Sequence, residues 1–296
     1  MSDLSNKRVG NISSSEIVAL TSNGRRDMTD EEIIEYKKEN PKGTRKTIDG
    51  FGAPFYTYVD ECVMERFFKN NLENESEVKA FSWGKLCELI VHDKLPNDYI
   101  MQSEITEVHP EISEWVGTPD GTKGLFYIET FLKDGVYITS PNKIKQAETV
   151  TDIKAPLTRK AFYNLIKFLY NFDGLTVSKK ENINGDEIIQ LIRNQSKEGE
   201  KYFWQLVSNA CILGAKYAEL IVFMPYFEEI EEIKEYNRTL EKPYWQIENM
   251  KDTELPYLYK ESGIDSINII RFEIKEEYKT FLTSRVKSAL ELINKN

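Results

Sequence analysis

The chain has 296 residues, of which 40% are hydrophobic and 12% aromatic, and its formal net charge at pH 7 is -10. No apolar run approaches the roughly 18 residues that span a bilayer, and the polar start MSDLSNKRVG lacks the apolar core of a secretory signal, so a globular cytoplasmic protein is expected. The negative charge opposes long-range attraction to a phosphate polymer, so contacts with nucleic acid require local basic clusters.

The first third of the chain is predicted to be mostly helical. A capping-box pair, Thr29 and Glu32, precedes a helix that Pro41 ends, and Ser13 stands at the same distance before a glutamate in an earlier helix. Apolar spacing supports two further helices. The helices expected in this part cover 11–22, 31–40, 54–72 and 82–95.

The middle of the chain changes to a period typical of strands. Short β-rich runs separated by DGTK and KDG turns are expected at 114–121, 124–132, 135–140 and 148–154. Helical spacing returns over 161–172, 185–192 and 201–220, and the last of these helices runs into an apolar strand at 219–225. This order predicts a crossover of that strand onto the same sheet.

The C-terminal part begins with an acidic stretch and an irregular segment over 242–263. A strand at 266–274 and a helix at 276–293 follow. We therefore expect a mixed α/β core whose sheet is flanked by helices. Its strands are expected near Val116, Phe126, Val136, Val150 and Val222.

The stretch TDIKAP places a carboxylate and an amine on one strand face, because Asp152 and Lys154 are two residues apart. Asp120, in the turn sequence GTPDG, is a candidate to share that face. Glu88 lies on a predicted helix one turn from Gly84, so a surface without side chains faces the same way as its carboxylate. Three converging acids need a cation near them.

The cation expected there is Mg²⁺ or Mn²⁺. Two carboxylates about 4 Å apart repel by roughly 4 kcal/mol at an effective dielectric of 20, and a hard divalent ion reverses the sign of that energy. Oxygen ligands favour these metals over zinc. The histidines, His92 and His109, are too few for zinc, and the three scattered cysteines suggest neither a disulfide framework nor a thiolate cluster.

These motifs resemble the PD-(D/E)XK nuclease superfamily and, within it, the YqaJ-like phage recombination exonucleases related to lambda exonuclease. The ordered residues that carry the resemblance are Glu88, Asp120, Asp152, Lys154 and Gln205. Arg8 and Ser15 have the spacing of the arginine and serine with which these exonucleases bind a 5′-phosphate. Asp152 stands where glutamate is commoner, and the segment between Thr21 and Phe81 resembles an insertion.

The resemblance implies a restriction-endonuclease-like fold with a helical N-terminal insertion. It implies one nuclease domain over 1–296, with a helical part over 1–95, a catalytic sheet core over 96–225 and a C-terminal extension over 226–296. Asp120, Asp152 and the carbonyl of Ile153 are then metal ligands, and Glu88 binds directly or through water. Lys154 orients the attacking water, and Gln205 helps to place Lys154 or the scissile phosphate.

The function that the resemblance implies is Mg²⁺-dependent 5′-to-3′ digestion of duplex DNA with free ends, in recombination or repair. A single-strand annealing protein is an expected partner, and a ring-shaped trimer is the expected oligomer. A phage-encoded protein of this kind acts in the bacterial host cytoplasm. The rival functions are a restriction-type endonuclease and a non-catalytic DNA-binding or assembly protein on the same fold.

Each motif also has an ordinary structural interpretation. The side chains of an Asp-x-Lys sequence often lie on a solvent-exposed strand face, and an aspartate such as Asp120 is common in turns. Gln205 can lie on the solvent-exposed face of its helix. Ser15 can be a helix cap. The loop PKGTRK, with Lys42 as its first basic residue, can be a solvated loop or a contact to backbone phosphates. The order of the five central motifs favours the nuclease.

Overall fold

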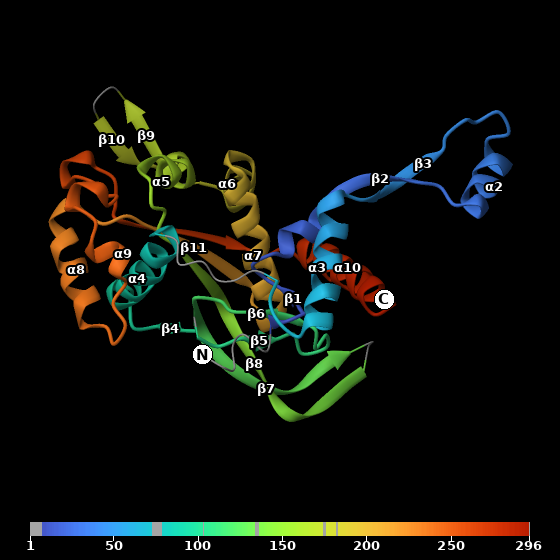
Figure 1. Cartoon of the computed structure of the whole chain (residues 1–296), viewed down its shortest axis with the longest axis horizontal. Helices are drawn as coiled ribbons and strands as arrows, with labels where there is room; N and C mark the ends of the chain where they lie inside the picture. Colours follow the sequence, from blue (N-terminus) through green and yellow to red (C-terminus); the bar gives the residue numbers. More distant parts are fainter. Residues whose placement is uncertain are drawn as a thin grey trace.

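The computed structural model describes residues 8–72, 79–102, 104–133, 136–173, 176–181 and 183–295. Its centre is a mixed sheet in which the strands lie side by side in the order β12, β11, β8, β7, β4. β11 runs parallel to β8, and the other neighbours are antiparallel (Figure 1). The bounds of these strands are β4 Tyr99–Met101, β7 Gly121–Lys133, β8 Val136–Lys154, β11 Tyr217–Phe223 and β12 Ile267–Glu273.

Helices cover both faces of this sheet. The described helices are α2 Asp30–Glu39, α3 Ala53–Phe68, α4 Lys79–Lys94, α5 Arg159–Ile166, α6 Gly185–Gln195, α7 Lys197–Leu213, α8 Ile230–Thr239, α9 Trp245–Glu248 and α10 Glu276–Ile293. Short 3₁₀ turns are η1 Ile17–Thr21, η2 Lys167–Leu169, η3 Phe227–Glu229, η4 Asp252–Glu254 and η5 Lys260–Ser262. Within the described ranges, we find no helix with the length and apolar character that crossing a membrane requires.

The alternation of side chains along β8 and β11 separates two hydrophobic cores. Val150 and Leu220 point into the core formed with α7 and α10, while Ile153 and Ile221 point into the core formed with α4 and α8. Six of the seven residues of β11 are buried. The helix-then-strand pattern of α7 and β11 thus forms the expected parallel crossover next to β8.

A second, smaller sheet lies beside the central one. It has the order β1 (Ile12–Ser13), β6 (Trp115–Gly117), β5 (Glu107–Val108). Val116 therefore belongs to this sheet, and its expected place in the central sheet is wrong. The helix expected over 11–22 is also wrong, because Ile12 pairs with Trp115 and only η1 is helical there.

The helix expected over 161–172 is shorter than its apolar pattern suggested. α5 ends at Ile166, and after η2 the chain forms strand β9 (Tyr170–Asp173), which pairs with β10 (Thr176–Lys179). Tyr170 donates its hydroxyl to Asn268 Oδ1 at 2.7 Å. The aromatic residues in this stretch fit a strand as well as a helix, and pairing decides between them.

Residues 23–51 form an arm that projects from the body of the protein (Figure 1). Strands β2 (Asn23–Asp27) and β3 (Thr47–Phe51) pair in an antiparallel ribbon, and α2 lies between them in the sequence. The capping box of Thr29 and Glu32 forms as expected, with both reciprocal hydrogen bonds. The segment between Thr21 and Phe81 is thus a ribbon with helices, and the sequence pattern predicted only its helices.

Candidate active site

Strands β7 and β8 bring Asp120 beside the end of β8. Asp120 immediately precedes β7, and its N–H donates to the Thr151 carbonyl at 3.1 Å. Its Oδ2 accepts the N–H of Ile153 at 2.7 Å. A Cβ at Gly121 would lie 2.6 Å from Thr151 Oγ1, so only glycine permits this close approach of the two strands. The turn therefore fixes the Asp120 carboxylate against the backbone of TDIK.

Asp152 is the centre of the charged group. Its side chain is fully buried, Lys154 Nζ lies 2.7 Å from its Oδ2, and Gln205 Nε2 donates to its Oδ1 at 2.9 Å. The ion pair confirms that Asp152 and Lys154 share a strand face. The alternative in which Gln205 lies on a solvent-exposed face of its helix is wrong, because Ser208 and Asn209 on that face are fully buried.

The partly exposed carboxylate of Asp120 is repelled by the fully buried carboxylate of Asp152. Burial, followed by the charge of Asp152, raises the pKa of Asp120 to about 6. Burial opposes the charged form of Lys154, but Asp152 and Asp120 outweigh that effect and raise its pKa above the ordinary lysine value. Lys154 is therefore a fixed cation that compensates only part of the negative charge around it.

Glu88 lies on α4 and pairs with a second lysine. Lys85 Nζ is 3.0 Å from Glu88 Oε2, one helical turn away. Burial lowers the pKa of Lys85, while Glu88 and, more weakly, Asp120 raise it, and the net shift is upward. In the described parts of the chain, no three His, Cys, Asp or Glu side chains form a ready metal-binding cluster.

A pocket of about 470 Å³, here called the carboxylate pocket, brings the predicted site residues together. The predicted residues that line it are Arg8, Ser15, Glu88, Asp120, Ile153, Lys154 and Gln205. Asp152 is buried beneath it and is joined to its wall through Lys154 and Gln205. Segments from separate parts of the chain thus converge on one hollow.

Three further residues of the carboxylate pocket were not predicted from the sequence. Lys85, Lys201 and Tyr202 line it, and Lys154 Nζ lies 5.0 Å from the centre of the Tyr202 ring. The signal for Lys85 was its position one turn before Glu88. The signal for Lys201 and Tyr202 was their place four and three residues before Gln205 on the same helix.

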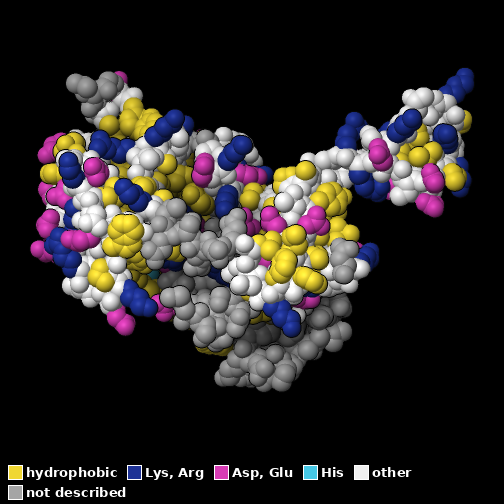
Figure 2. Space-filling model, in the orientation of Figure 1, with side chains coloured by type: hydrophobic (Ala, Val, Ile, Leu, Met, Phe, Trp, Pro, Cys, Tyr) yellow, Lys and Arg dark blue, Asp and Glu magenta, His cyan; other side chains and the backbone are white. Residues whose placement is uncertain are grey.

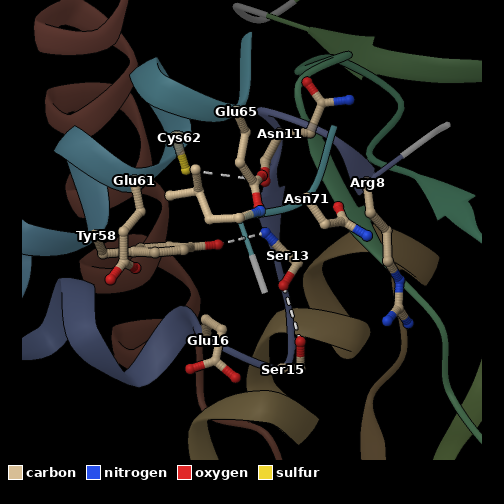
Figure 3. A pocket seen from close by; sticks show the side chains of 11 residues that line it. Arg8, Asn11, Ser13, Ser15, Glu16, Tyr58, Glu61, Cys62, Glu65 and Asn71 are labelled. Atoms are coloured by element: carbon tan, nitrogen blue, oxygen red, sulfur yellow. Dashed lines mark hydrogen bonds between the residues drawn. The ribbon is translucent and has the colours of Figure 1, made fainter. Parts of the chain in front are cut away.

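A second pocket of about 460 Å³, the serine pocket, adjoins the first, since Arg8 and Ser15 line both. Figure 3 shows Tyr58 and Arg8 on opposite sides of it. Ser13 N–H donates to Tyr58 Oη at 2.8 Å, and the hydroxyls of Ser13 and Ser15 are 2.9 Å apart. Three glutamates also line this pocket, namely Glu16, Glu61 and Glu65.

The donors of the carboxylate pocket fit a hard divalent cation. They are carboxylate and carbonyl oxygens, which Mg²⁺ and Mn²⁺ prefer. Burial, more than the neighbouring charge of Asp152, raises the pKa of Asp120, so the charged form of this carboxylate is disfavoured and a bound cation would stabilise it. The predicted ligands of such an ion are Asp120, Asp152, the carbonyl of Ile153 and, through water, Glu88, and the two carboxylate oxygens of Asp152 already contact Lys154 and Gln205.

Comparison with solved structures places this arrangement in a class of fold. The chain shares the fold of an alkaline exonuclease, LHK-Exo of Laribacter hongkongensis, solved in complex with dAMP. The TM-score is 0.51 at 11% sequence identity, and the match covers 99% of this chain and 93% of that one. The resemblance to lambda-type exonucleases inferred from the motifs is thereby confirmed at the level of the fold.

Two further solved structures are similar to a lower degree. A second structure of LHK-Exo gives a TM-score of 0.49 at 12% identity, covering 97% of this chain and 89% of that one. A phage-related exonuclease from Haemophilus somnus 129PT gives 0.46 at 12% identity, covering 96% and 94%. No protein-family model and no curated protein sequence matches the chain.

Proposed function

We propose that this protein is a Mg²⁺-dependent nuclease that digests duplex DNA from its 5′ ends. The observation that carries the proposal is the linked group of Asp120, Asp152, Lys154 and Gln205 at the wall of the carboxylate pocket. Phosphodiester hydrolysis needs acids that bind a metal and a cation that compensates developing charge, and this group supplies both. The shared exonuclease fold supports the same reaction class.

Each residue of this group has a defined part in the proposed reaction. Lys154 holds the attacking water and stabilises the negative charge that develops on the phosphate. Gln205 fixes the orientation of Asp152 through its 2.9 Å hydrogen bond. Asp120 and Asp152 would hold the metal, which would lower the pKa of a water molecule and neutralise phosphate charge when bound. Lys85 faces the same pocket and offers a second amine to the substrate phosphates.

The test is incubation of linear, nicked and closed circular duplex DNA with and without Mg²⁺. We expect linear DNA to be degraded only with the metal and closed circles to survive. Asp152→Asn should abolish degradation, whereas the matched control Asp93→Asn, an exposed aspartate near the end of α4, should leave it unchanged. Cutting of closed circles identifies an endonuclease, and no cutting in Mg²⁺ or Mn²⁺ identifies a non-catalytic protein.

The 5′-phosphate is proposed to bind where the two pockets meet. Arg8 and Ser15 line both pockets, and Lys201 lines the carboxylate pocket beside them. Within the serine pocket, Glu61 and Glu65 would repel an anion. The phosphate is therefore expected on the side of the carboxylate pocket, where the fixed charge of Arg8 recognises its extra negative charge.

A comparison of 5′-phosphorylated and 5′-hydroxyl linear duplexes tests this assignment. The native enzyme should degrade the phosphorylated substrate faster, and Arg8→Ala should remove the difference while metal-dependent cleavage persists. Arg238→Ala, which removes an exposed arginine on α8, is the matched control. Equal initial rates for the native enzyme would refute the phosphate site and would favour an endonuclease.

The proposed partners follow from the same function. Digestion of one strand leaves single-stranded DNA, which an annealing protein can take up, and a ring-shaped trimer would keep the duplex enclosed. Light scattering of the purified protein measures the oligomeric state. A monomer with full exonuclease activity would contradict the trimer.

A further inference from the structure

The outer end of the arm carries a cluster of basic side chains, here called the basic tip. Its members are Lys37, Lys38, Lys42, Arg45 and Lys46, and all five are exposed. Figure 2 shows the dark blue Lys and Arg side chains on the projecting arm. The protein as a whole has a formal charge of -10, so this cluster runs against the overall charge.

The basic tip differs from the arginines nearer the base of the arm. Arg26 makes two hydrogen bonds to Glu32, at 2.7 and 2.6 Å, and Arg25 lies 4.0 Å from Asp49. In the described parts of the chain, by contrast, no ion pair within 4.0 Å involves a member of the basic tip. Its positive charge is therefore available to a partner.

Part of the basic tip surrounds a hollow of about 580 Å³ between α2 and the following loop. The residues that line it are Asp27, Met28, Ile33, Lys37, Gly43, Thr44, Arg45 and Lys46. Arg45 Nε donates to the Thr47 carbonyl at 2.6 Å, which fixes the guanidinium beside this hollow. Three cations therefore outnumber the one carboxylate, Asp27, among the side chains that line this hollow.

Helix stability does not account for the whole cluster. Lys37 and Lys38 lie in the last turn of α2, where cations favour the helix dipole. Lys42, Arg45 and Lys46 lie beyond the helix, and the dipole interaction falls off within the last turn. The helix dipole therefore does not explain the charges in the loop.

A second copy of this chain fits the basic tip less well than a polyanion does. Protein interfaces deplete lysine in their centres and enrich large apolar residues. Within the arm, all of which the structure describes, Ile34 is the single large apolar side chain that is exposed, at 59%. Contacts to nucleic-acid phosphates, in contrast, use lysine and arginine side chains on concave or extended surfaces.

We propose that the basic tip binds backbone phosphates of the duplex DNA that the carboxylate pocket processes. The inference rests on the proposed nuclease function for its substrate. The arm projects from the body, so it contacts the duplex away from the bond that is cut. This contact adds affinity that is independent of base sequence, because phosphates are present in every sequence.

The experiment measures binding of a fluorescein-labelled blunt duplex by anisotropy, in EDTA and at a series of KCl concentrations. The variant is the triple substitution Lys37→Gln, Arg45→Gln and Lys46→Gln. Its matched control is Lys242→Gln, Lys251→Gln and Lys295→Gln, three exposed lysines outside the arm. The slope of log affinity against log salt should decrease in magnitude by about 0.9 for each phosphate that the variant no longer neutralises, and so by up to about 2.7.

The control variant should keep the native affinity and slope. Replacement of the same three tip residues by glutamate should weaken binding further, because repulsion then replaces attraction. An equal loss of affinity for glutamine and glutamate would point to a disrupted arm and would overturn the proposal. An affinity of the glutamine variant for the duplex equal to that of the native protein would also overturn it. So would a glutamine variant that keeps this affinity but has a different molecular mass in light scattering.

Failure of this proposal is distinguishable from failure of the proposed function. If the native protein binds the duplex through the tip but never cleaves it, the nuclease function fails and the tip contact stands. If cleavage is native in the glutamine variant and its binding is unchanged at all salt concentrations, the tip contact fails and the nuclease function stands.

Discussion

At the scale of single residues, the candidate site is a balance of one fully buried acid, Asp152, and two partly exposed groups, Asp120 and Lys154. Asp152 uses one carboxylate oxygen for Lys154 and the other for Gln205, whereas Asp120 has a backbone N–H as its partner. The two aspartates therefore differ in what they contribute to the fold. Asp152 pairs with the partly exposed cation of Lys154, whereas burial and the charge of Asp152 disfavour the charged form of Asp120, an effect that Lys154 and Lys85 offset only in part.

This difference gives opposite expectations for two similar substitutions. Asp120→Asn should raise the free energy of unfolding by about 1 kcal/mol at neutral pH in EDTA, because it removes repulsion at a buried site. Asp152→Asn should lower it by up to about 3 kcal/mol, because Lys154 loses its direct partner. Urea denaturation measures both, with Asp93→Asn as the exposed control. Equal effects of the two substitutions would contradict the assigned roles.

A histidine outside the pocket should give the protein a pH dependence. His109 stacks on Trp115, and its Nδ1 accepts the N–H groups of Glu111 and Ile112 at 3.1 and 3.2 Å. Burial, and to a lesser degree Lys287, lowers the pKa of His109 from 6.5 to about 4. Since the unfolded chain binds this proton more tightly, the stability from neutral His109 is present above pH 6.5 and lost as pH falls toward 4.

The measurement is urea unfolding of the native protein and of His109→Gln at a series of pH values. The native protein should lose more stability than the variant between pH 6.5 and 4. If both proteins show the same pH dependence over this interval, His109 is not the titrating group.

At the scale of secondary-structure elements, α7 positions the amide that holds Asp152. A buried polar cluster fixes this helix against the small sheet: Ser208 Oγ lies 2.7 Å from Ser14 Oγ and accepts Trp115 Nε1–H at 2.8 Å. Gly117 on β6 lies against the same cluster, and a Cβ there would overlap Asn209 Oδ1 and Ser14 Oγ. Gln205 is one turn away on α7, so the cluster also sets its position.

Two glycine-to-alanine substitutions separate packing from helix propensity. Gly117→Ala should lower the free energy of unfolding by about 1–3 kcal/mol, because the added methyl group displaces α7 from the small sheet. Gly84→Ala, inside α4, meets no atom within 4 Å and should raise it by about 0.5–1 kcal/mol. Thermal or urea unfolding of both variants measures these changes in the free energy of unfolding. A stabilised Gly117→Ala protein would show that the two elements are not tightly packed there.

At the scale of the whole molecule, the body and the arm have different sources of stability. The body has a hydrophobic core on each face of the sheet, and β11 belongs to both. The arm has no buried residue between 23 and 51. A two-stranded ribbon and a ten-residue helix are each marginally stable alone in water, so the arm depends on local hydrogen bonds and the Arg26–Glu32 pair.

Hydrogen exchange should show this difference directly. We expect the amides of β2, β3 and α2 to exchange through local opening, far faster than those of β11, which should exchange only on global unfolding. Mass spectrometry of peptic peptides measures both regions in one experiment. Bound duplex DNA should slow exchange in the arm if the basic tip contacts it. Equal protection of the arm and β11 without DNA would contradict this account.

The sequence by itself determined features that depend on neighbouring residues. The capping box at Thr29 requires only local spacing, and the shared face of Asp152 and Lys154 follows from the two-residue period of a strand. The sequence also predicted that the strand after α7 would join the central sheet, since a long amphipathic helix leads into an apolar strand there. Glu88, Asp120, Lys154 and Gln205 were predicted as site residues from their order along the chain, whereas Lys85, Lys201 and Tyr202 of the same pocket were not.

Only the tertiary structure decided which distant residues pair with each other. Ile12 pairs with Trp115, about a hundred residues later, and this pairing replaces the helix that local spacing favoured. The hydrogen bond of Gln205 to Asp152, in place of solvent, likewise depends on how α7 packs on the sheet. The physical reason is that local sequence sets conformational preferences of a few tenths of a kcal/mol per residue, whereas burial and long-range pairing contribute more and override them.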